Sequence, residues 1–375
     1  MRFQLTTGLA ALCLAAAACT GANEPTPSTA AGNSSVAPTT TESTTTTTNA
    51  STTSSAPAST TSTTTSAAPE PIPSGELEIV AYPVPAGSRP HDVAPAVDGG
   101  VWYTAQAAGE LGWLNPDTGE TVHYDLGDGS RPHGVIVDGD GRAWVTDGGR
   151  NSIQVFDPTT AEVIEYPLPA ERAGADLNTA AFDGAGLLWF TGQRGGVVGV
   201  LDPETGEMDV FDAPRGSGPY GIAATPLGTI YFASLAGSYV GLVGDEGEIT
   251  VLDPPTENQG ARRVWADSTG AVWVSEWNSG QLSRYDPADG SWEIWRLPGE
   301  NPSAYAVYVD ETDIVWVTDF GGDAIHRFDP ATESFFTFAL PHSGGNVRQL
   351  LGRPGEVWGG ESAADQLVVI RRKAG

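Results

Sequence analysis

Apolar and polar positions alternate in short stretches along most of the chain, and turn residues separate these stretches. The segment 131–169 shows the pattern clearly, because residues 135–137, 143–146, 152–157 and 162–168 are rich in β-branched and aromatic side chains, which favour strands. Asp-Gly and Asp-Pro sequences between them favour turns. The pattern predicts a small sheet of four antiparallel strands. Such a sheet cannot bury both of its faces alone, so it needs copies.

The copies are visible in the aromatic residue of the second predicted strand. It recurs at intervals of 42 to 45 residues, at Trp102, Trp144, Trp189, Tyr231, Trp273, Trp316 and Trp358. A four-stranded repeat of about 40 to 45 residues is typical of a β-propeller, whose sheets pack around a central channel. The sequence therefore predicts an all-β fold, a seven-bladed β-propeller, with the aromatic series in the core between blades.

The two ends of the repeat region predict how the ring closes. Residues 77–84 (LEIVAYPV) resemble the outer strand of a unit but precede the first unit, whereas the last unit stops after a third strand at 367–371. We expect the N-terminal strand to complete the last blade. Closure of this kind removes the open sheet edge that would otherwise aggregate.

The first 75 residues have a different composition. Residues 1–18 are typical of a lipoprotein-type signal peptide that ends before Cys19, which would carry the lipid; ordinary signal-peptidase cleavage nearby is the alternative. Residues 19–75 are rich in Thr, Ser, Pro and Ala, a composition that favours a disordered tether. The propeller would occupy residues 76–375. These features predict an extracytoplasmic protein that is anchored to the cell membrane as a lipoprotein, or secreted.

The charge of the chain limits its partners. The formal net charge is −29, with 18 Lys and Arg against 47 Asp and Glu. A field of this sign repels nucleic acid and anionic lipid, so we expect no nucleic-acid partner and membrane contact only through the lipid at Cys19. Both cysteines, Cys13 and Cys19, precede the propeller, which therefore uses no disulfide. We expect a monomer with a small-molecule or peptide ligand at the channel mouth.

Two series of positions differ from blade to blade, although the core positions repeat. The first-strand series is His91, His133, Asn178, Tyr220, Arg262, Tyr305 and about Val347; the second-strand series is Ala105, Asp147, Gly192, Ser234, Glu276, Asp319 and Glu361. Antiparallel pairing places both series at the same mouth of the channel, where ligand sites of propellers form. As substrate-binding residues we select Arg89, Arg131, Asn178, Tyr220, Arg262, Trp277, Tyr305 and Asp319.

His91 and His133 follow the same Gly-Ser-Arg-Pro sequence in adjacent units. They are candidate general acid/base groups or metal ligands; the alternative is that they hydrogen-bond the backbone where two blades meet. His123, His326 and His342 have no such setting, and we interpret them as surface residues.

The chain resembles the streptogramin B lyase (virginiamycin B lyase) family. The resemblance rests on PHG-type strand starts, on the second strands VWYT (101–104), AWVT (143–146), LWFT (188–191) and VWVT (315–318), and on the blade end YPLP (166–169). It implies a seven-bladed propeller that opens a cyclic depsipeptide by elimination at its ester, with a Mg²⁺ ion. It also implies two histidines on adjacent blades, one carboxylate fourteen residues after the second histidine, and another two residues before it.

On this chain the implied histidines match His91 and His133, and the downstream carboxylate matches Asp147; Arg131 stands where the upstream carboxylate is expected. The resemblance therefore implies His91 and His133 as catalytic residues, with His133 as the base. Mg²⁺ would be held by Asp147 with Glu361 or Glu276. Alternatively, Arg89 and Arg131 replace the metal, since paired guanidinium groups stabilise an oxyanion.

Two other functions stay open. The first is a non-catalytic extracytoplasmic propeller that binds a peptide or sugar in the aromatic funnel around Trp277, Phe320 and Tyr220. The second is a metal-dependent lactonase, in which Asn178, Glu276, Asp319 and Glu361 gather around a divalent ion.

Overall fold

The structure is a computed structural model that describes residues 69–244 and 246–374. The expected signal peptide, the lipidated Cys19 and most of the expected tether lie outside these residues. Two short 3₁₀ helices occur, η1 (Ser74–Glu76) and η2 (Ala170–Arg172). Within the described ranges no helix is long and apolar enough to span a bilayer.

The described chain forms seven four-stranded antiparallel sheets, which confirms the predicted seven-bladed propeller. The first three sheets, in order from the inner strand outward, are β2 (Pro90–Pro95), β3 (Val101–Ala105), β4 (Glu110–Leu114) and β5 (Thr121–Asp125); β6 (Pro132–Val137), β7 (Ala143–Asp147), β8 (Ser152–Asp157) and β9 (Glu162–Pro167); and β10 (Leu177–Phe182), β11 (Leu188–Gly192), β12 (Val197–Leu201) and β13 (Met208–Asp212).

The remaining four sheets follow the same plan. They are β14 (Pro219–Ala224), β15 (Ile230–Ser234), β16 (Tyr239–Val243) and β17 (Ile249–Leu252); β18 (Ala261–Ala266), β19 (Val272–Glu276), β20 (Gln281–Asp286) and β21 (Ser291–Arg296); β22 (Ala304–Val309), β23 (Val315–Asp319), β24 (Ala324–Asp329) and β25 (Ser334–Ala339); and β26 (Val347–Arg353), β27 (Glu356–Glu361), β28 (Gln366–Arg372) and β1 (Leu77–Pro83).

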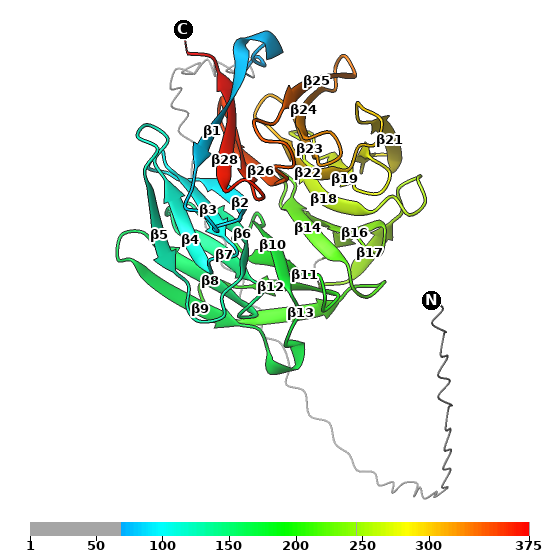
Figure 1. The fold of residues 1–375 in the computed structure, drawn as a ribbon. Coiled ribbons are helices and arrows are strands. Elements are labelled where there is room, and N and C mark those ends of the chain that lie inside the picture. Colours follow the sequence, from blue (N-terminus) through cyan, green and yellow to red (C-terminus); the bar gives the residue numbers. More distant parts are fainter. Residues whose placement is uncertain (1–68, 245, 375) are drawn as a thin grey trace, which may run out of the picture. The chain divides into compact units, whose positions relative to one another are not determined.

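The inner strands β2, β6, β10, β14, β18, β22 and β26 surround the centre of the ring, and the outer strands lie at its rim (Figure 1). The last blade closes as predicted, because β1 from the N-terminal side pairs with β28 at the C-terminal end. Their register runs from Leu77 opposite Arg372 to Pro83 opposite Gln366. The two ends of the propeller thus share one sheet, and the edge of β28 is covered.

The repeated aromatic series lies in the core between blades, as predicted. All seven side chains are buried, from Trp358 at 0 % exposed to Trp189 at 8 %. In several blades the indole Nε1 also donates to an aspartate of the turn that joins the first two strands. Trp144 donates to Asp138 at 2.7 Å, and Trp316 donates to Asp310 at 2.8 Å. The aspartate therefore fixes both the tight turn and the ring that packs below it.

Each inner strand contains a register shift near the channel mouth. In the second blade, Pro132 pairs with Asp147 and Gly134 with Thr146, so His133 is an extra residue between them. All seven inner hairpins show such a shift. A β-bulge bends the strand and redirects a side chain. Here it places one variable residue per blade at the mouth.

In the blades with a VWYT-type second strand, the threonine of that strand holds the bulge. The Thr104 hydroxyl accepts from the backbone N–H of Asp92 at 3.0 Å and donates to the backbone carbonyl of His133 in the next blade at 2.9 Å. Thr146 does the same between Gly134 and the carbonyl of Asn178. A single hydroxyl therefore fixes the bulge of its own blade to that of its neighbour.

We predict that deleting residues 76–84 lowers the melting temperature by more than 10 °C or leaves the protein insoluble, because the edge of β28 and the Leu77 side chain lose their cover. Thermal unfolding followed by circular dichroism measures this. An unchanged melting temperature would show that closure does not depend on β1.

Two leucine variants provide a matched control for that deletion. Leu77→Ala removes a side chain that is 7 % exposed in the core and should lower the free energy of unfolding by about 2 kcal/mol. Leu227→Ala changes a side chain that is 93 % exposed and should shift it by less than about 0.5 kcal/mol.

Candidate functional site

The seven bulge residues form a ring around the mouth of the channel. They are His91, His133, Asn178, Tyr220, Arg262, Tyr305 and Arg348. The sequence-based series placed the seventh position at about Val347, and this is wrong by one residue. Val347 pairs with Glu361 before the bulge, and Arg348 lies within it. The cavity at the mouth has a volume of about 200 Å³ and is lined by six of these seven side chains, all except that of Tyr305.

His91 and His133 lie in contact in this ring. Their ring centroids are 3.8 Å apart, with 43° between the ring planes. Only 3 % of His91 and 9 % of His133 is exposed. Two imidazoles packed so closely and away from water disfavour positive charge on either ring.

Asp92 contacts the His91 imidazole, and Arg263 in turn binds the Asp92 carboxylate. The His91 Nδ1 lies 2.8 Å from Asp92 Oδ1, and the two guanidinium nitrogens of Arg263 donate to the same carboxylate at 2.7 and 3.2 Å. Burial raises the pKa of Asp92 and outweighs the opposing effect of Arg263. Asp92 still acts as an acceptor, because a guanidinium can only donate. The imidazole therefore donates through Nδ1, and its Nε2 keeps a free lone pair.

Burial and nearby cations keep both imidazoles neutral. Burial, followed by the charges of Arg348, Arg263 and Arg262, holds the pKa of His91 well below its usual value. Burial, followed mainly by His91, likewise lowers the pKa of His133, although Asp92 opposes the shift. A neutral imidazole keeps an unprotonated ring nitrogen, so both rings have the protonation state that a general base needs, while the lowered pKa reduces their strength as bases.

Two tyrosines continue the network from His133. The His133 Nε2 lies 3.2 Å from the Tyr220 hydroxyl, which lies 2.5 Å from the hydroxyl of Tyr305. Burial, reinforced by Tyr305, raises the pKa of Tyr220. Burial also acts to raise the pKa of Tyr305, but the charges of Arg262, Arg348 and Arg263 outweigh it and lower that pKa. The phenols thus provide proton donors beside the histidine pair.

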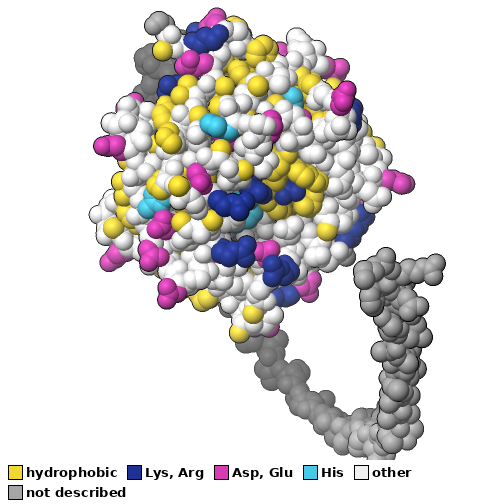
Figure 2. Space-filling view, in the orientation of Figure 1, with side chains coloured by type: hydrophobic (Ala, Val, Ile, Leu, Met, Phe, Trp, Pro, Cys, Tyr) yellow, Lys and Arg dark blue, Asp and Glu magenta, His cyan; other side chains and the backbone are white. Residues whose placement is uncertain are grey.

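Arginines give the mouth a positive charge in an otherwise acidic protein. Figure 2 shows basic side chains gathered near the centre of the ring. The Arg262 guanidinium carbon lies 3.6 Å from the centre of the Tyr305 ring and 4.8 Å from that of Trp277. Arg348 donates to the Tyr305 hydroxyl at 3.3 Å, and Arg131 lines the cavity. Arg89, a predicted binding residue, is exposed and does not line this cavity.

The carboxylates of the second-strand series are directed into the blades, where they hold loops. Asp147 accepts from the Ser130 hydroxyl and from three backbone N–H groups, those of Arg131, Gly149 and Arg150. Similar contacts hold the others: Asp319 accepts from the N–H groups of Ser303 and Gly321, Glu276 from the hydroxyls of Ser279 and Ser283, and Glu361 lies 3.0 Å from His342. None of these four lines the mouth cavity.

These residues do not fit the Mg²⁺ ion that the family resemblance implies. Within the described part of the chain, one group of three potential ligands converges, namely His91, Asp92 and His133. Mg²⁺ prefers oxygen ligands, whereas this group offers two imidazoles and a carboxylate that Arg263 already neutralises. A divalent cation would also lie among arginines whose charges already lower the pKa of His91.

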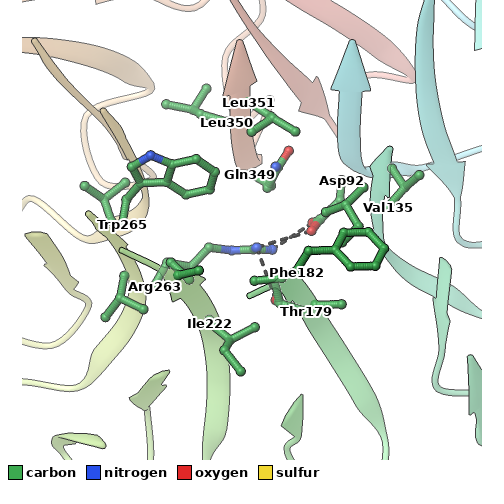
Figure 3. A pocket seen from close by; sticks show the side chains of 18 of the residues that line it. Asp92, Val135, Thr179, Phe182, Ile222, Arg263, Trp265, Gln349, Leu350 and Leu351 are labelled. Carbon is green, nitrogen blue, oxygen red and sulfur yellow. Dashed lines mark hydrogen bonds and ion pairs between the residues drawn. The ribbon is translucent and has the colours of Figure 1, made fainter. Parts of the chain in front are cut away.

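Below the mouth the channel continues as a second cavity of about 310 Å³. Its walls are largely apolar and include Val135, Phe182, Ile222 and Trp265. The Arg263 side chain crosses this space to reach Asp92 (Figure 3). The ion pair therefore separates the apolar channel from the polar mouth.

Sequence reasoning missed Asp92 and Arg263. Both lie one position after the bulge residue of their blade, where other blades have small residues such as Gly134, Gly221 and Ala306. The presence of a charged residue at a position that is small in other blades was the sequence signal that could have identified Asp92 and Arg263. His326 is a second correction, because it is 2 % exposed and contacts Thr337 and Asp319, whereas a surface position was expected.

Comparison with known proteins agrees with the fold and the repeat. The model of the virginiamycin B lyase family matches residues 72–320. The chain belongs to this family. No curated protein is a significant sequence match to it.

Solved structures show the same architecture at low sequence identity. A streptogramin B lyase superposes with a TM-score of 0.73 and 20 % identity over 79 % of this chain and 98 % of that one. A catalytically inactive virginiamycin B lyase from Staphylococcus aureus, crystallised with quinupristin, superposes with a TM-score of 0.73 and 19 % sequence identity. The match covers 80 % of this chain and 100 % of that one. The extracellular domain of a one-component system from B. thetaiotaomicron superposes with a TM-score of 0.60 and 18 % sequence identity, over 77 % of this chain and 40 % of that one. At these identities the likeness shows the fold alone.

We predict that Asp92→Asn lowers the free energy of unfolding by about 3 to 5 kcal/mol, because it leaves the Arg263 guanidinium buried without its counter-charge. The double variant Asp92→Asn/Arg263→Met should be more stable than the sum of the two single effects predicts. Urea unfolding of the four proteins measures this coupling.

The exposed ion pair between Arg372 and Glu76 is the matched control, since its side chains are 61 % and 50 % exposed. Glu76→Gln and Arg372→Met should each cost less than about 1 kcal/mol. The double variant Glu76→Gln/Arg372→Met completes this second cycle, and a coupling energy equal to that of the buried pair would contradict a special role for Asp92 and Arg263.

Proposed function

We propose that the protein is a carbon–oxygen lyase that opens an ester by elimination at the channel mouth, without a metal. The observation that carries this proposal is the neutral His91, whose Nδ1 is bonded to Asp92 and whose Nε2 is free. A base with this tautomer and environment suits abstraction of a proton next to a carbonyl group. His133 was the expected base, but its Nε2 contacts Tyr220.

The step needs no second reactant. His91 Nε2 takes the proton on the carbon beside the carbonyl, and the electrons of that C–H bond form a carbon–carbon double bond as the bond to the leaving oxygen breaks. Arg262 and Arg348 lie where they can stabilise the negative charge that develops on the carbonyl oxygen. The oxygen leaves as part of a carboxylate, and the Tyr220 hydroxyl, which stays protonated because burial raises its pKa, can donate a hydrogen bond to it.

Family membership supports this class of reaction. A related lyase was crystallised with quinupristin, and we propose a cyclic depsipeptide ester as the first substrate to test. We further propose an extracytoplasmic location with an anchor at Cys19, because extracellular sensor domains share the fold and the N-terminal sequence is typical of a lipoprotein.

A second candidate function is ligand binding without chemistry. It is favoured by Arg131, which stands where the family resemblance implies a metal-binding carboxylate. The lactonase hypothesis has less support, because Glu276, Asp319 and Glu361 bond groups within their own blades and do not meet Asn178 at the mouth.

The test is incubation of the purified protein, treated with a chelator, with a streptogramin B depsipeptide. Mass spectrometry separates the reactions, because elimination gives a ring-opened product of unchanged mass, whereas hydrolysis adds one water. We predict an unchanged mass, and at least about a hundredfold loss of rate in His91→Gln. His123→Gln is the control, since His123 lies on β5, where it contacts Tyr103 and Glu110.

Two outcomes would contradict the proposal. One is a rate in His91→Gln equal to that of the wild type, which would exclude His91 as the base. The other is an activity that appears only when Mg²⁺ is restored, which would exclude the metal-free reaction. A wild-type protein that binds the depsipeptide but leaves it intact would favour the binding function.

A further inference from the structure

Three arginines at the mouth have no carboxylate partner. Arg131, Arg262 and Arg348 line the cavity, and none forms an ion pair with any described residue. Ten other described arginines do, and the remaining three without an ion pair, Arg89, Arg296 and Arg327, do not line this cavity. Asp176, the acidic residue in the lining, lies 3.7 Å from Arg194 at the rim. In a chain with a net charge of −29, unpaired cations clustered at one point indicate an anion-binding site.

The rest of the lining is polar in a way that suits hydroxyl groups. Gln106, Asn178 and Gln193, which carry side-chain amides, are among the residues that line the cavity. The Oδ1 of Asn178 is buried and has no hydrogen-bond partner within the described chain. Amide groups can both donate to and accept from hydroxyls, so a ligand with several hydroxyl groups would satisfy them.

Three aromatic rings lie against Arg262 and Arg348, just outside the set of residues that line the cavity. The Tyr305 and Phe320 rings stack with centroids 4.5 Å apart, and Trp277 meets Phe320 edge-on at 5.4 Å. Trp277 and Phe320 are both partly exposed. Partly exposed rings beside unpaired polar groups provide an apolar face and a hydrogen-bonding face for one ligand.

We infer that the mouth binds an acidic sugar, a uronate whose carboxylate is held by Arg348 and Arg262. The carboxylate meets the guanidinium groups, the hydroxyls meet the amides, and an apolar face of the sugar ring packs on the aromatic rings. This inference rests on the proposed function for its chemistry, but not for its binding.

The same residues would then cleave a linked uronate. His91 Nε2 takes the proton on the carbon that bears the carboxylate, and the electrons of that bond form a double bond to the adjacent carbon. The bond from this carbon to the glycosidic oxygen breaks, and the oxygen takes the proton of the Tyr220 hydroxyl. Arg262 and Arg348 neutralise the carboxylate while negative charge builds on it. The products are an unsaturated uronate and a free sugar hydroxyl, so no water is consumed.

The experiment is a calorimetric titration of the purified full-length protein with a trimer of 1,4-linked galacturonate and, in parallel, with its methyl ester. The ester keeps the sugar ring and its hydroxyls but removes the negative charge. We predict that the acid binds at least about tenfold more tightly than the ester, and that Arg348→Gln removes this preference. Arg172→Gln is the control, since Arg172 pairs with Asp212 away from the mouth. Thermal unfolding of Arg348→Gln and Arg262→Gln shows whether each variant is folded.

The outcomes separate this inference from the proposed function. Equal affinity for acid and ester, or no binding of either, overturns the acidic-sugar site even if the depsipeptide is opened. Tight binding of the acid with no unsaturated product from any substrate supports the site and overturns the lyase proposal. Binding together with ultraviolet absorbance of the new conjugated double bond supports both.

Discussion

A side-chain hydroxyl that repeats in the second strand of five blades, at Thr104, Thr146, Thr191, Ser275 and Thr318, is the interaction that organises the channel mouth. In the first blade, Thr104 accepts from the backbone of Asp92 and donates to the carbonyl of His133 in the next blade. Ser275 similarly donates to the carbonyl of Tyr305 at 2.6 Å. Because only backbone groups of the bulge are bonded, the side chain there is free to vary. The fold thus places seven side chains at one mouth of the channel, and the identity of each can vary independently of the others.

The buried pair of Asp92 and Arg263 converts this ring into a chemical site. A buried ion pair is a poor source of stability in itself, but it orients groups around it. Here the carboxylate fixes the tautomer of His91, while the guanidinium adds positive charge that helps to keep both imidazoles neutral. The same pair closes the mouth against the apolar channel below. Base, proton donors and anion-binding groups therefore share one small polar space.

The sequence was sufficient to predict the architecture, because each repeat of the sequence corresponds to one blade. The spacing of the aromatic series predicted seven blades, and the outer-strand pattern of residues 77–84 predicted closure. The β-bulges limited the prediction of which side chains face the channel mouth, because the strict alternation of side-chain directions along a strand fails across an extra residue. They moved the seventh mouth position from Val347 to Arg348. They also separated His133, which faces the mouth, from Asp147, whose carboxylate holds a loop.

The contact between Asp92 and Arg263 was beyond sequence reasoning for a different reason. The two residues are 171 positions apart and meet only because the ring places their blades across the channel from each other. Both occupy a repeated position, one residue after the bulge, but each departs from the small residue found there in several other blades, and the family resemblance implies neither. The role of a single charged residue in an inner strand cannot be predicted until its partner across the channel is known.

The most direct test is nitrogen-15 magnetic resonance of the histidine side chains, with His91→Gln used to assign the His91 signals. We expect a neutral His91 that carries its proton on Nδ1 at about pH 7, because burial and the nearby arginines hold its pKa well below the usual histidine value. An imidazolium at about pH 7, or a neutral ring protonated on Nε2, would contradict the account.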